Sequence, residues 1–358
     1  MPSDLPFAEA AERALGEVLF RYLIGRPRDA EASAPDPNAA AMSRYKLVPR
    51  VLQGHAGVEL STTLCDQNVA APLAIGAFAG DRLFHPDGLL PLAEVCHDLR
   101  LPLFVSEETV TPLTEITAVH DGCWLQLRAA GTRERAVAMI DAAAHAGVRG
   151  VIFTVLAPIH PVPGLQPGGF SLGRELTERG WRTIGSAEPG IEPLAAFPAW
   201  SAEDLAAAVR HAARANLPVL AKGILHPADA YRAEEAGCAG MVVSNIGVRQ
   251  SWRWVAPADC LGGIRQAVRG GLLLDGGVRS GTDVLVAAAL GATLAVTTRP
   301  AVSALAGGGV SGLRTWLRDW MDEMRAVLAW CGCTTPSDLG PDHLFHAGLG
   351  GSITGERQ

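Results

Sequence analysis

Short apolar runs that alternate with stretches of helical length limit the folds open to this chain of 358 residues. The runs are rich in Val, Ile, Leu and Ala and are too short for helices, so each predicts a strand. Eight strands are predicted, at residues 72–78, 101–105, 123–128, 150–155, 218–221, 240–244, 271–275 and 294–297. The predicted helices include residues 132–146, 201–215, 227–236, 257–268, 281–290 and 313–330.

Eight strand-then-helix units with right-handed crossovers predict an α/β fold, a closed parallel (β/α)₈ TIM barrel. Barrel strands are buried on both faces, which explains why the runs are apolar throughout. A doubly wound open sheet is the alternative, but no Gly-x-Gly-x-x-Gly follows the first strand. The proline-rich segment 156–200 interrupts the alternation, and we expect it to be a lid or substrate loop after strand four.

The residues before the barrel form a cap in this interpretation. We expect an N-terminal helix over 7–24, a flexible stretch over 28–41 and a short hairpin over 47–60. Residues 1–60 then cap a barrel that spans residues 61–358 and includes the lid loop 156–200.

Charge and cysteine usage exclude several classes of partner. The net charge of −7, without a long basic run, argues against nucleic acid and an anionic membrane surface, and no apolar run is long enough to cross a membrane. Seven irregularly spaced cysteines are typical of reduced thiols. The first residues carry Asp4, Glu9 and Glu12 and do not resemble a signal peptide. A cytoplasmic protein with a small-molecule partner is expected.

Polar side chains follow the predicted strands at their carboxyl ends, which converge on one mouth of a barrel. They are Ser106, Gln126, Arg128, Thr154, Lys222, Ser244, Asn245, Asp275, Thr298 and Arg299. The histidines have no convincing ligand spacing, so no metal site is predicted. Three tryptophans of the last helix, Trp316, Trp320 and Trp330, are expected in the core because of their near-helical spacing.

The last two units carry the features of a phosphate site. Asp275 begins the run Asp-Gly-Gly-Val-Arg-Ser-Gly, in which Gly277 lets the backbone approach an anion, Arg279 pairs with it and a helix starts at once. Thr298 and Arg299 add a second arginine at the next strand. The alternative is a tight strand-to-helix turn whose glycines only satisfy the backbone.

Four ordered motifs carry a family resemblance. They are Ala221-Lys222-Gly223, the run 244–250 (Ser-Asn-Ile-Gly-Val-Arg-Gln), the run 274–283 and Thr298-Arg299-Pro300. In these motifs the chain resembles the FMN-dependent α-hydroxy-acid oxidases and dehydrogenases, which include glycolate oxidase, lactate oxidase and mandelate dehydrogenase. The resemblance extends from Tyr22 to Cys333, almost the whole chain.

The resemblance implies a nearly complete FMN site. The matching cofactor residues are Ala79, Ser106, Gln126, Thr154, Lys222, Ser244, Asp275, Gly277, Arg279, Thr298 and Arg299. Lys222 matches the lysine beside flavin N1 and O2, where a positive charge stabilises the anionic reduced flavin. The family usually has glycine where Thr298 stands. Family analogy also suggests a homotetramer.

The substrate half departs from the family pattern. Ile246 stands where the family has the histidine base, and an aliphatic side chain cannot accept a proton. Arg128 replaces a tyrosine and Leu156 replaces the aspartate that tunes the histidine, and no second substrate arginine is found near Pro163. Tyr22 and Arg249 match the family's substrate-binding tyrosine and carboxylate-binding arginine.

Three functions remain open. The first is an FMN oxidoreductase in which hydride passes from a small, carboxylate-bearing substrate to flavin N5 with altered proton handling. The second is a redox-neutral flavin enzyme, and the third is a catalytically silent FMN-binding subunit. For the first, the predicted catalytic residues are Lys222, Arg249, Tyr22 and Arg128, and the candidate replacement bases are Glu108 and His160.

Overall fold

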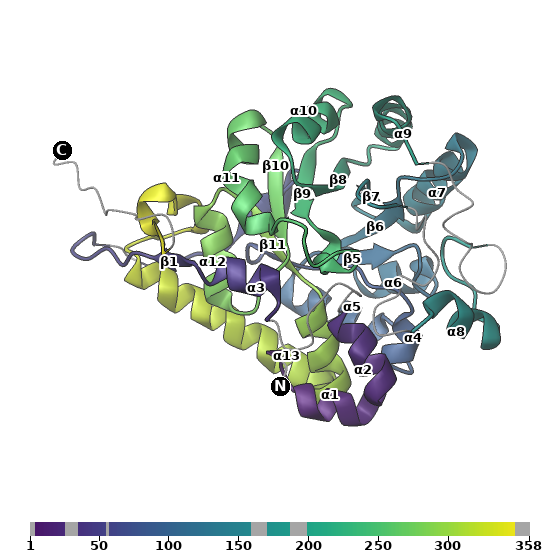
Figure 1. Ribbon diagram of the computed structural model, residues 1–358, viewed down its shortest axis with the longest axis horizontal. Coiled ribbons are helices and arrows are strands. Elements are labelled where there is room, and N and C mark those ends of the chain that lie inside the picture. The colour runs from purple at the N-terminus through teal and green to yellow at the C-terminus, as the bar shows by residue number, and fades with distance from the viewer. Residues whose placement is uncertain (1–3, 26–34, 55–56, 159–169, 187–198, 348–358) are drawn as a thin grey trace.

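Eight parallel strands form a closed barrel surrounded by helices in the computed structural model, which describes residues 4–25, 35–54, 57–158, 170–186 and 199–347 (Figure 1). The strands are β4 (Leu73–Ile75), β5 (Leu103–Ser106), β6 (Cys123–Arg128), β7 (Gly150–Thr154), β8 (Val219–Ile224), β9 (Gly240–Ser244), β10 (Gly271–Asp275) and β11 (Leu294–Thr297). They pair in chain order, and β11 pairs with β4 to close the barrel. The (β/α)₈ prediction is confirmed.

The parallel register brings the polar strand ends together. Arg128 pairs with Thr154, and Thr154 pairs with Lys222 on the next strand. On the two strands that follow β8, Ser244 of β9 pairs with Asp275 of β10. The carboxyl ends therefore form one ring of functional side chains.

The inside of the barrel is an apolar core. Its buried side chains come from all eight strands and include Ala74, Phe104, Trp124, Ile152, Leu220, Val242, Leu273, Leu294 and Val296. The antiparallel hairpin of β2 (Thr62–Leu64) and β3 (Gln67–Val69) adds Leu64 and Val69 to this cluster.

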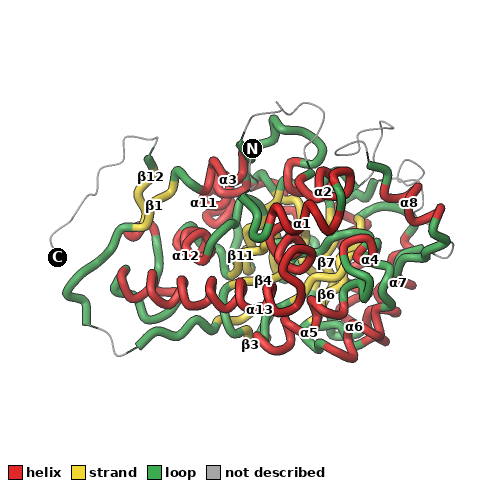
Figure 2. The backbone as a smooth tube through the Cα atoms, turned by 90° about the horizontal axis from the view of Figure 1, so that it is seen from below, coloured by secondary structure: helices red, strands yellow, loops and turns green. Residues whose placement is uncertain are grey.

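The hairpin was predicted over 47–60, but the structure places it at residues 62–69. The two-residue turn at Cys65 and Asp66 has positive φ at both positions, 47° and 63°, which suits a tight hairpin. Leu47 is instead the last residue of β1 (Tyr45–Leu47). This strand pairs with β12 (Leu344–His346), which lies late in the chain (Figure 2).

Helices cover the outside of the barrel and bury a second, larger apolar layer against it. They are α4 (Asp81–Phe84), α5 (Leu90–Leu99), α6 (Leu113–Val119), α7 (Arg133–Ala146), α9 (Ala202–Arg214), α10 (Pro227–Glu235), α11 (Pro257–Ala267), α12 (Gly281–Ala289) and α13 (Arg299–Trp330). Short 3₁₀ helices are Ile246–Val248, Pro336–Asp338 and Pro341–His343. Ser201 forms a capping box with Asp204 at the start of α9. Among the described residues, no helix is long and apolar enough to span a bilayer.

The predicted N-terminal helix is interrupted. It forms α1 (Ala8–Leu15) and α2 (Glu17–Ile24), because Gly16 adopts φ 74° and ψ 160°. Both helices lie beside α13 (Figure 2). A Cβ on Gly307 would lie 2.7 Å from the amide nitrogen of Ala11, so this glycine permits α1 to pack closely.

Three other expectations need correction. Within the stretch expected to be flexible, residues 37–42 form α3 (Pro37–Met42), since Asp36 accepts hydrogen bonds from the first-turn amides. The segment 156–200 is not all loop, because it contains α8 (Leu172–Glu178), whose Leu172 and Leu176 pack in one cluster with residues of α2. Trp320 is buried, but Trp330 is 66% exposed at the end of α13.

Candidate active site

A cavity of about 550 Å³ opens at the carboxyl ends of the strands. Helix α2, residues 156–158 and residues 171–173 complete its wall. The predicted site residues that line it are Tyr22, Ala79, Ser106, Gln126, Arg128, Thr154, Lys222, Arg249, Asp275, Gly277, Arg279, Thr298 and Arg299. The fold therefore brings together side chains that lie far apart in the sequence.

Lys222 and Ser244 converge on one carboxylate. Lys222 Nζ lies 2.8 Å from Asp275 Oδ2, and Ser244 Oγ donates to the same oxygen at 2.8 Å. Ser244 is fully buried and is not among the residues lining the cavity. Its hydroxyl also accepts a hydrogen bond from the amide of Ile246. Ser244 thus holds Asp275 and the loop after β9, and Lys222 faces the cavity.

Three buried oxygens in the cavity wall have no hydrogen-bond partner in the described part of the chain. They are Gln126 Oε1, Thr154 Oγ1 and Thr297 Oγ1. An unsatisfied buried polar group is costly, so such atoms indicate a ligand that supplies the missing bonds. Thr297 was not predicted, because it precedes the motif residues Thr298 and Arg299.

Two arginines meet at the ends of β10 and β11. Asp36 Oδ2 lies 2.9 Å from Arg279 Nη2 and 3.3 Å from Arg299 Nη1. The pKa of Arg299 is lowered to about 10, chiefly by burial; Asp36 opposes this shift, and the positive charges of Arg249 and Arg279 add to it. A bound phosphate would stabilise this cluster. Sequence reasoning missed Asp36, although an Asp-Pro pair is a common helix start.

In the predicted phosphate motif, Gly277 and the first amides of α12 make contacts within the protein. The space beside Gly277 is filled by the main chain of Asn38, so its missing side chain makes room for α3. At the start of α12, the amides of Gly281 and Thr282 donate to Glu323. The candidate phosphate site therefore depends on the arginines rather than on the end of this helix.

Tyr22 and Arg249 form a unit in the same cavity, where the guanidinium groups of Arg249 and Arg299 both border Gly25. The guanidinium carbon of Arg249 lies 4.8 Å from the centre of the Tyr22 ring, and Nη2 donates to the carbonyl of Tyr22 at 3.3 Å. Burial raises the pKa of Tyr22. Ile246 lines the cavity with φ 49°, a strained conformation for a β-branched residue.

Arg128 is held by a carboxylate that was not predicted. Its Nε and its backbone amide both donate to Glu107 Oε1 at 2.7 Å. The second oxygen of Glu107 accepts from Arg135, and Glu107 is only 2% exposed. Glu107 therefore fixes the direction of the Arg128 guanidinium.

Of the two candidate replacement bases, Glu108 lies in the cavity wall. Its side chain is 23% exposed, and Oε1 lies 4.0 Å from Arg128 Nη1. Burial raises the pKa of this carboxyl group. His160 and Pro163 lie outside the described residues, and Leu156 lines the cavity.

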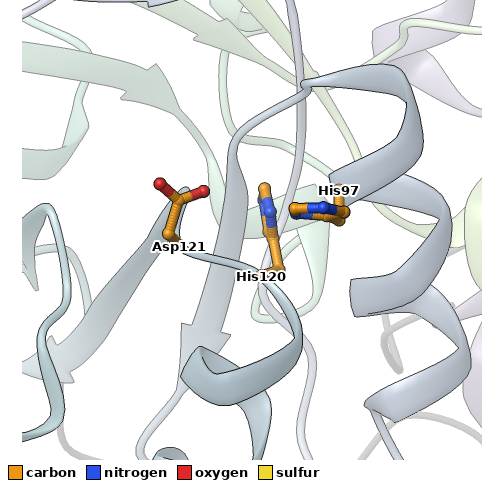
Figure 3. A group of neighbouring side chains, drawn as sticks. All are labelled: His97, His120 and Asp121. Atoms are coloured by element: carbon orange, nitrogen blue, oxygen red, sulfur yellow. The ribbon is translucent and has the colours of Figure 1, made fainter.

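A second group of titratable side chains lies away from the mouth, where His97, His120 and Asp121 approach one another (Figure 3). His120 Nε2 lies 2.9 Å from the carbonyl of Leu101, and burial lowers the pKa of His120. Asp121 accepts from Arg149 at 2.6 Å. One ring nitrogen of His120 and one oxygen of Asp121 are thus already bonded to protein groups.

The barrel and its mouth together define a class of enzyme. Unpartnered oxygens and a buried lysine suit a hydrogen-bonding ring system, and the paired arginines suit a phosphate, so the residues fit FMN. Residues 11–346 match the FMN-dependent dehydrogenase family, and the chain belongs to that family.

Curated relatives and solved structures agree with this assignment. The chain is 34% identical to 4-hydroxymandelate oxidase of Amycolatopsis orientalis, with 90% of this chain and 93% of the relative covered. It is 33% identical to 2-hydroxyacid oxidase 1 of Homo sapiens, covering 91% and 92%. A crystal structure of mandelate oxidase with benzoyl-formic acid has a TM-score of 0.80 at 31% identity, covering 95% and 96%. The protein is an FMN-dependent oxidoreductase resembling the α-hydroxy-acid oxidases.

Proposed function

We propose that the protein oxidises a small, carboxylate-bearing substrate at the carbon next to the carboxylate, with proton handling that does not use position 246. The observation that carries this proposal is one cavity that holds the Lys222–Asp275 pair, the two arginines bridged by Asp36 and the Tyr22–Arg249 unit. Bound FMN would supply the oxidant by accepting a hydride at N5.

The residues of the wall have separate roles in this proposal. Lys222 holds a positive charge beside the ring system, and Asp275 fixes its position. Gln126 and Thr154 supply hydrogen bonds to the ring edge, and Ala79 and Ser106 border it. Arg279, Arg299, Thr298 and Gly277 border the phosphate end, and Asp275 and Ser244 connect the two ends.

The substrate carboxylate binds Arg249, whose guanidinium Tyr22 orients. Arg128 presents a second cation to the cavity. Ile246 cannot accept a proton, and the altered position is consistent with a substrate that loses its proton to another group.

The first experiment is the visible spectrum of the purified protein, with the released chromophore identified by mass. Bound FMN, followed by anaerobic bleaching with a 2-substituted carboxylic acid, is the expected result. Bound FMN that no such acid bleaches would favour a silent flavin-binding subunit or a redox-neutral enzyme. A colourless protein that does not take up added FMN would contradict the assigned site.

We also propose a cytoplasmic homotetramer in which residues 1–60 cap the barrel and residues 156–200 act as a lid. Exposed apolar side chains support self-association, since Val51 and Leu52 are 75% and 101% exposed and Trp330 is 66% exposed. The amide of Arg50 donates to the carbonyl of Trp330, so these side chains lie in one region. Sedimentation of the wild type and of Leu52→Glu tests the oligomeric state, and a monomeric wild type would contradict the homotetramer.

A further inference from the structure

Two neighbouring carboxylates in the cavity wall have different surroundings. Glu107 accepts bonds from Arg128 and Arg135 and is almost completely buried. Glu108 turns toward the cavity, and its ion-pair contact with Arg128 is 4.0 Å long, beyond hydrogen-bond range. Both oxygens of Glu107 are therefore bonded to protein arginines, whereas the carboxylate of Glu108 can bind a ligand in the cavity.

The surroundings of Glu108 belong to the substrate half. Glu108 lines the cavity together with Arg249 and Tyr22. Burial raises the pKa of Glu108, and the charges of Arg128 and, less strongly, Arg249 oppose that shift. The Ser106 hydroxyl accepts a bond from the Glu108 amide at 3.1 Å, which fixes the turn after β5. A ligand that reaches Arg249 thus also meets a carboxylate.

This pairing suits a ligand with both signs of charge. A hydroxy acid offers Arg249 its carboxylate, but it offers Glu108 only a neutral hydroxyl whose proton needs a positioned base. An ammonium group pairs with a carboxylate by a charge-assisted hydrogen bond. Its proton is also far more acidic than that of an alcohol.

We propose that the substrate is an α-amino acid, bound with its carboxylate on Arg249 and its ammonium group on Glu108. This inference rests on the proposed function and names the substrate class of the same cavity. It accounts for Ile246, because an amine needs no imidazole to become a hydride donor once Glu108 has taken a proton from the ammonium.

The reaction balances with the cofactor already assigned. Glu108 takes one proton from the ammonium group, and the nitrogen lone pair then forms the C=N bond as the Cα–H bond breaks. The hydride carries two electrons to the flavin, which is the oxidant. The product is an imino acid, which water converts to a 2-oxo acid and ammonia.

Matched ligands test the inference by binding. The FMN-loaded protein is titrated anaerobically by calorimetry with three pairs: glycine and glycolate, L-alanine and L-lactate, and L-phenylglycine and (S)-mandelate. We expect at least one amino acid to bind about tenfold more tightly than its hydroxy acid, the value of one charge-assisted bond. Tighter binding of the hydroxy acid in every pair, or no binding of any amino acid, would overturn the inference.

Two variants test whether Glu108 and Arg249 cause the preference for the amino acid. Glu108→Gln should remove the preference for the amino acid and leave the hydroxy acid unchanged or tighter. Arg249→Met should weaken both members of a pair. Glu115→Gln, an equal charge change at an exposed position of α6, is the control and should keep the preference. A preference that survives Glu108→Gln in a protein with normal flavin absorbance would refute the role of Glu108.

Flavin absorbance recorded in the same anaerobic titrations separates the inference from the proposed function. Binding of an amino acid without bleaching supports the ligand class and contradicts the proposed oxidation. Bleaching by hydroxy acids alone supports an oxidation and overturns the amino-acid assignment.

Discussion

The cofactor side and the substrate side of the cavity differ in how their charged side chains are paired. On the cofactor side, Lys222 pairs with Asp275, and Asp36 bridges Arg279 and Arg299. On the substrate side, Arg249 lies against an aromatic ring, and Glu108 has a contact to Arg128 that is too long for a hydrogen bond. Both sides contain close ion pairs, since Glu107 holds Arg128 on the substrate side. The substrate side differs because, within the described part of the chain, Arg249 and Glu108 form no close ion pair and can meet a small molecule.

This difference indicates where the chain follows its family and where it does not. The residues expected to match the FMN site line the cavity, except Ser244, which holds Asp275 by a hydrogen bond. Of the positions expected to depart from the family, 128, 156 and 246 line the cavity, as does Thr298 at the phosphate end. Function is determined by the site rather than by the barrel, so a changed substrate on a retained cofactor is the consistent interpretation.

The largest expected effect concerns stability within the substrate side. Glu107→Gln leaves Arg128 and Arg135 without their shared carboxylate, and we expect the free energy of unfolding to fall by about 3 kcal/mol. Urea denaturation measures the loss. Glu108→Gln is the matched control and should change stability little, because burial already disfavours its charge. Equal losses of stability in both variants would show that Glu107 and Glu108 contribute alike to the folded protein.

The next effect concerns the flavin wall. Lys222→Met removes the positive charge beside the ring system, and we expect single-turnover flavin reduction to slow by about 10²–10³-fold. Stopped-flow absorbance measures this rate, and the FMN content of the variant is determined separately. Unchanged reduction in a variant with full FMN content would refute the role of Lys222.

A smaller effect tests the phosphate end. Arg299→Gln should weaken FMN binding by about tenfold or more, since it removes one charge-assisted pair. Asp36→Asn should do the opposite and tighten binding, because the carboxylate that bridges the two arginines competes with phosphate. Asparagine is an equally good helix cap, so α3 should persist. Quenching of FMN fluorescence measures both, and weaker binding in Asp36→Asn would show that the aspartate positions the arginines instead.

Much of the fold follows from the sequence because barrel strands have a strong, continuous apolar signal. The bounds of β6, β9, β10 and β11 agree with the predicted ranges. The N-terminal region was less predictable, since Gly16 breaks a helix whose apolar pattern continues across it. The pairing of β1 with β12 joins segments about 300 residues apart, and local patterns carry no information about such a partner.

The candidate site shows a similar limit. Motifs identified Lys222 and Arg279 because both lie in local runs with a typical composition. Asp36 and Glu107 were missed, because their importance comes only from arginines that lie far away in the sequence. Glu108 was one of two candidate bases by sequence, and its place in the cavity wall distinguishes it from its neighbour.

The smallest expected effect is a gain. Ile246→His restores an imidazole in the cavity wall, and we expect weak oxidation of lactate, glycolate or mandelate, below the rate with an amino acid. Histidine also tolerates the positive φ of this position better than a β-branched residue does. Anaerobic flavin bleaching measures the gain, and Ile246→Asn controls for relief of backbone strain without a base. If the histidine variant gains nothing, the missing base is not the only barrier, and Glu108 and Arg128 have made the substrate side unsuitable for a hydroxy acid.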